Sequence, residues 1–370
     1  MSPADIDTSV LVTTFRRPRH LELVLESIAA QEGVPRTFEV IVSDDGSEDQ
    51  TADVVAAFAA RADVPVRFTS QPHAGFRLAR VRNNAARLAE GRYLLFLDGD
   101  CVLPSHHLAA HRQRRQAGGA LLGYCARLGE QESRPLIERG LAGANLAGLV
   151  TNAEARLLSR RHRRAVWHGM IRHPTKPRLA GGDFGVWRSD FAQVNGFDER
   201  FEGWGQEDDD LGLRLRAAGV RLASILDATC SLHVWHPTDP TATSRWRDGV
   251  NVGYFERRGR LTSCRRGLAA RDRSAILWGL PRDIAGSPLG REVLACLGGC
   301  RVAAPGGDCE IEIAVNGPNR RFSHRAECRL LLVGAGEMPD RLLAAQADRT
   351  VSIPLDAAAA TIEQLLEEVG

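Results

Sequence analysis

The chain has 370 residues, of which 44% are hydrophobic and 25% charged, and its formal net charge is +2. This composition excludes a disordered chain. A net charge so close to zero gives no sign of a nucleic-acid-binding protein, so we expect no nucleic acid partner. The length is too great for one ordinary core and too small for three large domains.

The sequence has no apolar run of about 18 residues, and no basic segment followed by an apolar run at its N-terminus. We therefore expect a cytoplasmic protein whose 8 cysteines are mostly free thiols. Two basic runs, at residues 111–115 and 160–164, are either solvated helix faces or patches that hold the protein peripherally at the inner face of the membrane.

Strand and helix patterns alternate over the first 105 residues. Short apolar runs predict strands at 9–14, 38–43, 64–69 and 92–97, and apolar residues at helical spacing predict helices at 19–31, 51–60 and 76–90. This alternation predicts an α/β fold with a mostly parallel, doubly wound sheet. Ligands bind such sheets at the carboxyl ends of the strands, where three polar clusters stand: Thr13 to Arg16, Asp44–Asp45 and Asp98 to Asp100.

The rest of the chain is less regular. A helical pattern covers residues 136–165, a glycine-rich stretch covers 178–187, and an acidic stretch leads into a helix at 209–218. We expect one domain over 1–255, with one half at 1–105 and another at 178–240; the resemblance described below implies that the first binds the nucleotide and the second binds the acceptor and is catalytic. A linker or peripheral helices at 256–285 then lead to a small α/β extension of unknown role at 286–370, with strands at 309–315 and 329–333 and a last helix at 357–369.

Asp98 and Asp100 follow the fourth predicted strand, with Gly99 between them. Residues i and i+2 of an extended chain point to the same side, so the two carboxylates are expected to form a hard oxygen site for Mn²⁺ or Mg²⁺. A divalent ion there can neutralise a departing diphosphate.

The run from Gly203 to Asp210 places four consecutive carboxylates after a Gly-Trp-Gly sequence. Asp209 and Asp210 are expected to begin a helix, where acidic groups complement the helix dipole. Trp204 offers a flat apolar face on which a sugar ring can stack. A carboxylate beside it is suitably placed to act as general base for an acceptor hydroxyl.

Two further features complete the predicted site. Either His233 or His236, with His233 preferred, is expected to bind the metal through a neutral imidazole. The glycine-rich stretch is expected to bring backbone close to a ligand, so that Gly182 and Asp183 line the acceptor site together with Trp204.

These motifs together resemble a known family. Thr13 to Pro18, Asp44 to Ser47, Ala79 to Asn83 and Phe96 to Asp100 are similar to the motifs of family 2 glycosyltransferases of GT-A fold. Residues 181–236 resemble the galactosyltransferase-type module of chondroitin-polymerising enzymes and animal β-1,4-galactosyltransferases. Gln206 departs from the most common Gly-Trp-Gly-Gly motif, so galactose specificity is not carried over.

The resemblance implies a role for each matching residue. Thr13, Phe15 and Arg16 would line the nucleotide pocket, Asp44 or Asp45 would hydrogen-bond uracil, and Arg80 would approach the donor. Asp98 would face the ribose or the metal, which Asp100 and His233 would bind. Asp208 matches the catalytic base, with Glu207 beside it in contact with the donor or acceptor sugar.

The resemblance implies an inverting enzyme that moves a hexose or N-acetylhexosamine from a UDP-sugar to a saccharide, a lipid-linked or a small-molecule acceptor. Such a reaction belongs to the biosynthesis of polysaccharide, lipopolysaccharide or another glycoconjugate. The alternatives are a sugar nucleotidyltransferase, which needs a phosphate loop that residues 13–18 do not provide, and an inactive sugar-binding scaffold protein. The sequence leaves the oligomeric state open.

Overall fold

The computed structural model describes residues 6–237, 248–317 and 321–369. The chain divides into two compact units, residues 1–252 and 253–370, and each is considered by itself. No helix among the described residues is long and apolar enough to cross a membrane.

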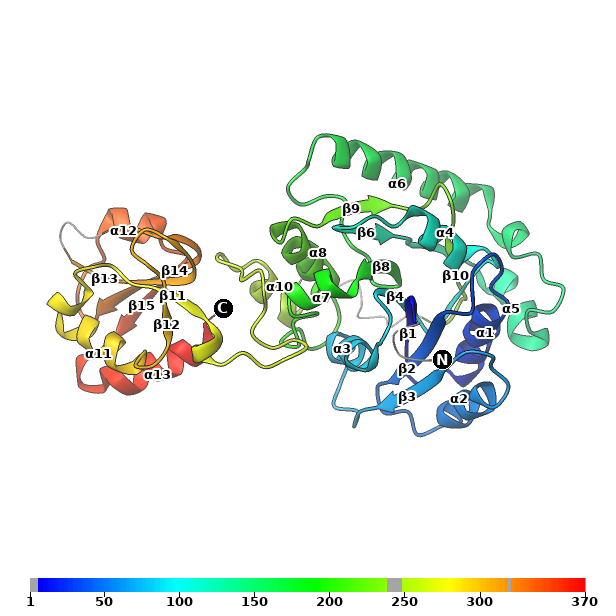
Figure 1. Ribbon diagram of the computed structural model, residues 1–370, viewed down its shortest axis with the longest axis horizontal. Helices are drawn as coiled ribbons and strands as arrows, with labels where there is room; N and C mark the ends of the chain where they lie inside the picture. Colours follow the sequence, from blue (N-terminus) through cyan, green and yellow to red (C-terminus); the bar gives the residue numbers. More distant parts are fainter. Residues whose placement is uncertain (1–5, 238–247, 318–320, 370) are drawn as a thin grey trace. The chain divides into compact units, whose positions relative to one another are not determined.

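A seven-stranded sheet organises the first unit (Figure 1), in the order β3-β2-β1-β4-β8-β6-β9. Four neighbouring strands run parallel: β3 (Val66–Ser70), β2 (Phe38–Asp44), β1 (Thr8–Thr14) and β4 (Tyr93–Asp98). Next comes β8 (Asp183–Trp187), antiparallel to both of its neighbours, followed by β6 (Gly119–Leu122) and β9 (Arg221–Ser224). The predicted α/β fold with a mostly parallel sheet is confirmed.

Helices connect the parallel strands in the manner that the sequence predicts. They are α1 (Pro18–Ala29), α2 (Thr51–Ala59) and α3 (Leu78–Leu88). Pro18 suits the first turn of α1, because the missing N–H has no partner within the helix there. The apolar face of α1 is fully buried through Leu21, Val24, Leu25 and Ile28.

The middle of the chain adds further helices and a small second sheet. The helices are α4 (His107–Arg114), α5 (Glu130–Arg139), α6 (Asn152–Met170), α7 (Arg188–Gln193), α8 (Glu207–Ala217) and α10 (Val250–Phe255). The small sheet has the order β5-β10-β7, with β5 at Cys101–Val102, β10 at Ser231–His233 and β7 at Cys125–Arg127. In this sheet β10 pairs with β5, which directly follows β4 in the sequence.

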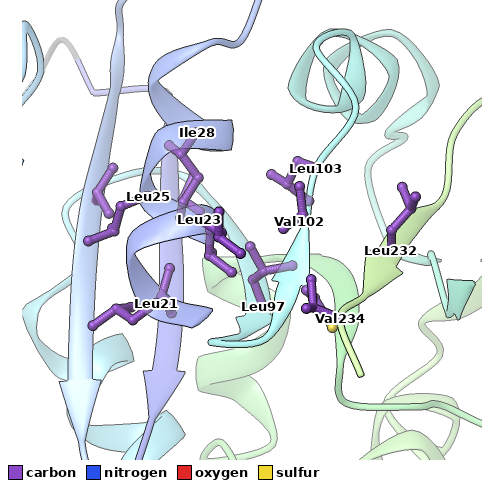
Figure 2. Close-up of a cluster of buried hydrophobic side chains, with 14 of the residues drawn as sticks. Leu21, Leu23, Leu25, Ile28, Leu97, Val102, Leu103, Leu232 and Val234 are labelled. Carbon is purple, nitrogen blue, oxygen red and sulfur yellow. The ribbon is translucent and has the colours of Figure 1, made fainter. Parts of the chain in front are cut away.

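One hydrophobic core joins these pieces (Figure 2). Leu21, Leu23, Leu25 and Ile28 of α1 pack in the same cluster as Leu97 of β4, with Val102, Leu103, Leu232 and Val234 from the small sheet and the residues next to it. All of these side chains are buried. Full burial of one such side chain contributes roughly 1.5–3 kcal/mol, so this cluster fixes β4 and β10 firmly relative to each other.

The second unit is a separate α/β fold on a five-stranded, all-parallel sheet in the order β12-β11-β13-β14-β15. Its strands are β11 (Leu277–Gly279), β12 (Arg301–Val302), β13 (Asp308–Val315), β14 (Arg325–Gly334) and β15 (Arg349–Ile353). Its helices are α11 (Pro288–Cys296), α12 (Arg341–Gln346) and α13 (Ala358–Glu368).

Residues 256–285 differ from the expected linker or peripheral helices. Leu261, Ile276 and Trp278 are buried in the core of the second unit, and β11 is a strand of its sheet. The many arginines of this segment concealed the difference, because they interrupt its apolar residues and leave no regular hydrophobic pattern. Arg265 is itself buried and donates to the carbonyl oxygens of Leu366 and Val369.

Candidate active site

The register of the parallel strands brings the predicted polar clusters to one level. Thr14 pairs with Asp44 across β1 and β2, and Thr13 pairs with Asp98 across β1 and β4. The Thr13 hydroxyl donates to Asp98 Oδ1 over 3.2 Å. The carboxyl ends of these strands therefore form one continuous polar edge, as expected for a doubly wound sheet.

Arg82 is the centre of the site. This α3 side chain is buried, and it donates to Asp98 over 3.1 Å and to Asp208 over 2.6 Å. Its guanidinium also lies 3.6 Å from Glu207. One buried cation thus joins the Asp-x-Asp end of the site to the acidic helix start. Burial by itself would lower the pKa of Arg82, but the three carboxylates outweigh that effect and raise it.

Arg80, which we expected to approach the donor, is exposed on α3, and the buried arginine is Arg82. Helical periodicity favours Arg82 as the buried arginine of this helix. It lies three residues after Ala79 and three before Ala85, both of which are buried on the same stripe of α3.

Gly181 is required by close packing around this cation, and Gly182 is tightly packed beside it. A Cβ at Gly181 would overlap the Arg82 guanidinium and the Asp208 carboxylate, and one at Gly182 would lie 3.1 Å from Asp98 Oδ2. The Gly181 N–H donates to Asp208 Oδ2 over 2.8 Å. Gly182 therefore lines the site through its backbone beside Asp98.

The loop before α8 is left-handed at three of four positions. Gly203, Gly205 and Gln206 have φ of 81°, 99° and 70°. Such values suit glycine, and they are uncommon for a residue like Gln206 that carries a side chain. The carbonyl oxygen of Gly205 accepts from Asn251 Nδ2 over 2.9 Å. This turn presents Trp204, half-buried, and starts α8 with its acidic residues in the first turn.

The four carboxylates of α8 have four different environments. Asp210 is buried against Arg214 one turn on, at 2.6 Å, and Asp209 pairs with Arg178 at 3.2 Å. Glu207 is buried near Arg82, whereas the Asp208 side chain remains 25% exposed. Burial and the neighbouring Asp208 raise the pKa of Glu207 to about 8, despite the opposing charge of Arg82.

Asp100 lies in a second cluster with both candidate histidines. Its carboxylate is 3.6 Å from His233 Nε2 and 3.2 Å from His236 Nε2, and it accepts from Arg17 over 2.9 Å. The arrangement follows from β-pairing, because His233 is opposite Cys101 and the Val234 N–H donates to the Asp100 carbonyl.

The donor atoms of this cluster fit a divalent ion. One atom each from Asp100, His233 and His236 lies within 4.8 Å of the others. Burial opposes the charge on Asp100, but His236, His233 and Arg17 outweigh it and lower its pKa to about 2. Burial also lowers the pKa of His233, which favours the neutral imidazole that binds metals. Asp98, the other predicted ligand, lies outside the cluster and pairs with Arg82.

Asp44 and Asp45 differ in what they bind. Asp44 accepts from the backbone N–H groups of Gly46 and Ser47 and from the hydroxyls of Ser47 and Ser70, so it holds the turn that follows β2. Asp45 accepts from Gln71 Nε2 over 2.6 Å and lies 3.3 Å from His73 Nδ1. The oxygens of Asp44 therefore already accept hydrogen bonds within the fold. Of the two residues, Asp45 is the better placed to hydrogen-bond a ligand.

An aromatic pair stands beside Asp45. Phe15 and His73 stack with their ring centroids 4.4 Å apart, and the Arg16 guanidinium lies 4.8 Å from the Phe15 centroid. The Arg16 N–H donates to the Ser47 hydroxyl, which ties this loop to the turn after β2. A planar aromatic surface next to a carboxylate and an amide is suited to a planar ligand with hydrogen-bonding edges.

Asp183 is not part of the acceptor surface that we expected. Its side chain is completely buried and faces His107 and His111 of α4. The side chains of a strand alternate between two faces, so Asp183 points away from the ligand edge although Gly182 lies on it. The glycine-rich composition of residues 181–185 concealed the start of β8.

The two basic runs also differ from each other. In the run 111–115, His111 is buried, Arg114 pairs with Asp227 and Arg115 pairs with Asp7, so little of it is an open patch. In the run 160–164 on α6, all four arginines are exposed. They are followed by exposed Trp167 and Met170.

Comparison with known proteins gives two consecutive family matches. Residues 9–166 match Glycosyl transferase family 2, and residues 163–236 match the N-terminal domain of galactosyltransferase. Together the two matches span the residues around Arg82, Asp100 and Asp45 described above. The first unit is therefore a glycosyltransferase domain of GT-A fold. Within that class, residues 9–166 form a family 2 glycosyltransferase segment, and residues 163–236 form a galactosyltransferase-type module that is similar to part of the chondroitin synthases.

Individual relatives agree with this assignment. Validoxylamine A glucosyltransferase from Streptomyces hygroscopicus subsp. limoneus is 34% identical over 233 residues, which are 57% of this chain and 48% of that protein. Chondroitin synthase from Escherichia coli is 22% identical over 250 residues, 64% of this chain and 36% of that protein. The chain thus spans about half or less of the length of these relatives.

Among solved structures, the mannosyltransferase PcManGT from Pyrobaculum calidifontis, in complex with GDP-Man and Mn²⁺, aligns with a TM-score of 0.46 at 19% identity. The alignment covers 66% of this chain and 61% of that chain.

Proposed function

We propose that this chain is an inverting, divalent-metal-dependent glycosyltransferase that moves a sugar from a UDP-sugar to an acceptor hydroxyl. The observation that carries the proposal is the double ion pair of Arg82, with Asp98 on one side and Asp208 on the other. These two carboxylates come from different motifs. A transfer reaction needs the groups that bind the donor and the acceptor to lie about the length of one sugar ring apart.

The donor end is the cluster of Asp100, His233 and His236. These three residues would hold Mn²⁺ or Mg²⁺, and two imidazoles favour a transition ion such as Mn²⁺ over Mg²⁺. The ion would neutralise charge on the departing diphosphate. Arg17, already 2.9 Å from Asp100, is positioned to pair with a phosphate oxygen when Asp100 binds the ion.

The base of the nucleotide would lie against the ring of Phe15, next to Asp45. The stacking surface is supported by the Phe15–His73 pair, and the hydrogen-bonding edge by Asp45 and Gln71. Thr13 and Arg16 border the same loop, and Asp98 stands between it and the metal cluster, where a ribose would lie.

The acceptor end is Asp208, which we assign as the general base. Its side chain is more exposed than that of Glu207, the other acidic residue of α8 beside Arg82. The Gly181 N–H and Arg82 fix the direction of its two oxygens. An oriented carboxylate that takes the acceptor proton as the oxygen attacks the anomeric carbon gives inversion in one displacement. Glu207, with its raised pKa, would be a neutral hydrogen-bond donor to substrate rather than a second base.

The half-buried Trp204 would stack on the acceptor or donor sugar. Relatives named as a glucosyltransferase and as chondroitin synthases support a hexose or an N-acetylhexosamine as the sugar that is moved. The names of these relatives point to two classes of acceptor, a small molecule for the validoxylamine A glucosyltransferase and a polysaccharide for the chondroitin synthases. A saccharide, a lipid-linked or a small-molecule acceptor in glycoconjugate biosynthesis therefore remains within the proposal.

A membrane-bound acceptor is favoured by one surface. Exposed arginines at 160, 161, 163 and 164 of α6 are followed by Trp167 and Met170, which are 55% and 77% exposed. Basic side chains beside exposed apolar ones suit the headgroup region of an anionic bilayer. We propose peripheral contact of this end of α6 with the inner face of the membrane, with a cytoplasmic active site.

The experiment is donor hydrolysis. The full chain is incubated with Mn²⁺ and a panel of UDP-sugars, and released UDP is measured with and without EDTA. We expect slow, EDTA-sensitive UDP release from one or two donors. When acceptor is added, we expect the Asp208→Asn variant to lose the UDP release that transfer to the acceptor produces. Absence of UDP release from every donor, with and without candidate acceptors, would mean an inactive sugar-binding protein.

A further inference from the structure

A second cluster of metal-binding groups lies in the interior of the first unit. His107 and His111 are one turn apart on α4, so they share a face of the helix. Asp183 begins β8 opposite them. His107 Nε2 and His111 Nε2 are 3.3 Å and 3.8 Å from Asp183 Oδ1, and no more than 2% of any of the three side chains is exposed.

The inward-facing atoms of this cluster have no well-aligned hydrogen bond. Among the described residues, none reaches either histidine Nε2 or either oxygen of Asp183 with good geometry, although His107 Nε2 is 3.3 Å from Asp183 Oδ1 and Ser231 also neighbours this carboxylate. Leaving a buried polar atom without a partner costs about 1–3 kcal/mol, and more for a charged group. Arg115, which follows α4, is not available to compensate the carboxylate because it pairs with Asp7 in two hydrogen bonds.

The outer ring nitrogens are occupied, which fixes the direction of the inner ones. His107 Nδ1 is 2.9 Å from the Thr229 hydroxyl, and His111 Nδ1 is 3.3 Å from the Tyr93 hydroxyl. Histidines that bind metals commonly donate their second N–H to such a partner, which orients the ring and leaves the other nitrogen as the ligand. Two Nε2 lone pairs and a carboxylate would then converge on one point.

The geometry fits a tetrahedral ion. A Zn–N distance of about 2.0–2.1 Å places the ligand atoms of a tetrahedral site about 3.4 Å apart. The two nitrogen-to-oxygen distances are close to that value, and all three ligand atoms lie within 4.8 Å of one another. The site is closely built, because a Cβ at Gly123 would overlap the Asp183 carboxylate.

We propose that His107, His111 and Asp183 form a structural site for Zn²⁺, separate from the cluster around Asp100. Three protein ligands leave one position for a water or another oxygen ligand. Full burial leaves no path for a substrate, so the ion would be structural. It would tie α4 to the start of β8 and hold Gly182 against Asp98. The alternative is a metal-free cluster in which each Nε2–H donates to Asp183 while Nδ1 accepts from the two hydroxyls.

The test uses the full chain from cultures supplemented with Zn²⁺, or with Co²⁺ as a spectroscopic probe, because a buried site fills most readily during folding. The double variant Asp100→Asn/His236→Gln removes the other cluster. We expect this variant to retain about one equivalent of metal after dialysis against EDTA, as measured by elemental analysis. We also expect tetrahedral Co²⁺ absorption bands and X-ray absorption that shows imidazole and oxygen ligands.

Two outcomes would overturn the proposal. One is a double variant that folds by circular dichroism and holds less than about 0.1 equivalent of metal, since the metal-free cluster would then be the correct description. The other is sulfur in the metal shell, or an unchanged metal content when His107→Gln/His111→Gln is added to the Asp100→Asn/His236→Gln variant, since the ion would then lie elsewhere. The first measurement needs no change in the buried site, so a folding defect of the histidine variant leaves the test intact.

Discussion

Arg82 Nη1 lies 2.6 Å from Asp208 Oδ1, although the two residues are 126 positions apart in the sequence. The same guanidinium contacts Asp98 through Nη2. Residues from the family 2 segment and from the galactosyltransferase segment therefore meet on one buried side chain. The contact makes the proposed donor end and the proposed acceptor end a single electrostatic unit.

Replacing Arg82 by Met should destabilise the domain strongly. Removal of one partner from a buried ion pair typically costs about 3–5 kcal/mol, and here the carboxylates of Asp98 and Asp208 and the carboxyl group of Glu207 would lose their cation. We expect Arg82→Lys to recover only part of the stability. It restores the positive charge, but one ammonium cannot donate to two carboxylates with the geometry of a guanidinium. Urea unfolding monitored by tryptophan fluorescence gives the free energies.

The matched control is Arg80→Met, on the same helix but exposed. We expect its free energy of unfolding to change by no more than about 0.5 kcal/mol. A larger loss in Arg80→Met than in Arg82→Met would contradict the assignment of Arg82 as the centre of the site.

Asp208→Asn should separate catalysis from binding. The amide keeps the shape of the side chain and cannot take a proton, so we expect transfer to fall about 10²–10⁴-fold while UDP affinity changes little. Initial rates of transfer and calorimetric titration with UDP measure the two quantities. We expect a smaller loss for Glu207→Gln, because Gln resembles the protonated Glu207 that a pKa of about 8 implies at neutral pH. Near-normal transfer by Asp208→Asn together with a severe loss in Glu207→Gln would identify Glu207 as the base.

The raised pKa of Glu207 predicts a pH dependence of stability. Its ordinary pKa of 4.5 applies to the unfolded chain and about 8 to the folded one, so the folded state holds the extra proton between these values. The stability that this proton provides is complete below about pH 4.5 and is lost as the pH rises toward about 8. Glu207→Gln should therefore gain stability relative to the native chain as the pH rises, by up to about 1.4 kcal/mol per pH unit. Thermal unfolding of both proteins at several pH values measures the difference, and a constant difference would refute the shift.

The residues that the sequence singled out as metal ligands, Asp100 and either His233 or His236, lie together in the structure, and their binding of a metal stays a prediction. The buried Arg82 at the centre of the site was not predicted. Asp100 and His233 were recognisable because each lies in a local pattern, the Asp-x-Asp after a strand and the histidine in a short strand. Pairing of that strand with Cys101 brings them together and adds His236. Arg82 was missed because its importance depends on carboxylates from three distant segments, which only tertiary contacts reveal.

The parallel half of the sheet was predictable for a similar reason, since its strands and helices carry strong local periodicity. The antiparallel insertion of β8 between β4 and β6 was not predictable. Gly182 and Asp183 are adjacent in the sequence, yet the start of β8 sends one to the site and the other into the interior. A glycine-rich stretch does not reveal that alternation, and Asp183 was placed on the wrong face.

Asp100→Asn should remove the metal dependence of nucleotide binding. The substitution deletes the charged ligand of the cluster and leaves two imidazoles. Changes in partners outside the metal shell typically cost about 10–100-fold in metal affinity, so loss of a ligand should cost at least as much. We expect calorimetric UDP binding by the native chain to be strengthened by Mn²⁺ and binding by the variant to be indifferent to it. Strengthening of equal size in both proteins would place the ion elsewhere.

The basic end of α6 should bind anionic membranes. Each arginine near an anionic bilayer contributes about 1 kcal/mol, so Arg160→Ala/Arg164→Ala should weaken binding by about 2 kcal/mol, roughly 30-fold. Co-sedimentation with vesicles containing 30% or so of phosphatidylserine measures this partition. Binding should fall at high salt, because the interaction between exposed charges is screened. Trp167→Ser should weaken binding in a manner that salt does not change, because that side chain contributes apolar burial.

The control for net charge is Arg301→Ala/Arg321→Ala, which removes two exposed arginines from the second unit. We expect this variant to bind vesicles as the native chain does. If both double variants lose binding equally, the attraction comes from overall charge and the end of α6 is not a docking surface. Vesicles of neutral lipid alone should retain neither protein, because they offer no anionic headgroups to the arginines at the end of α6.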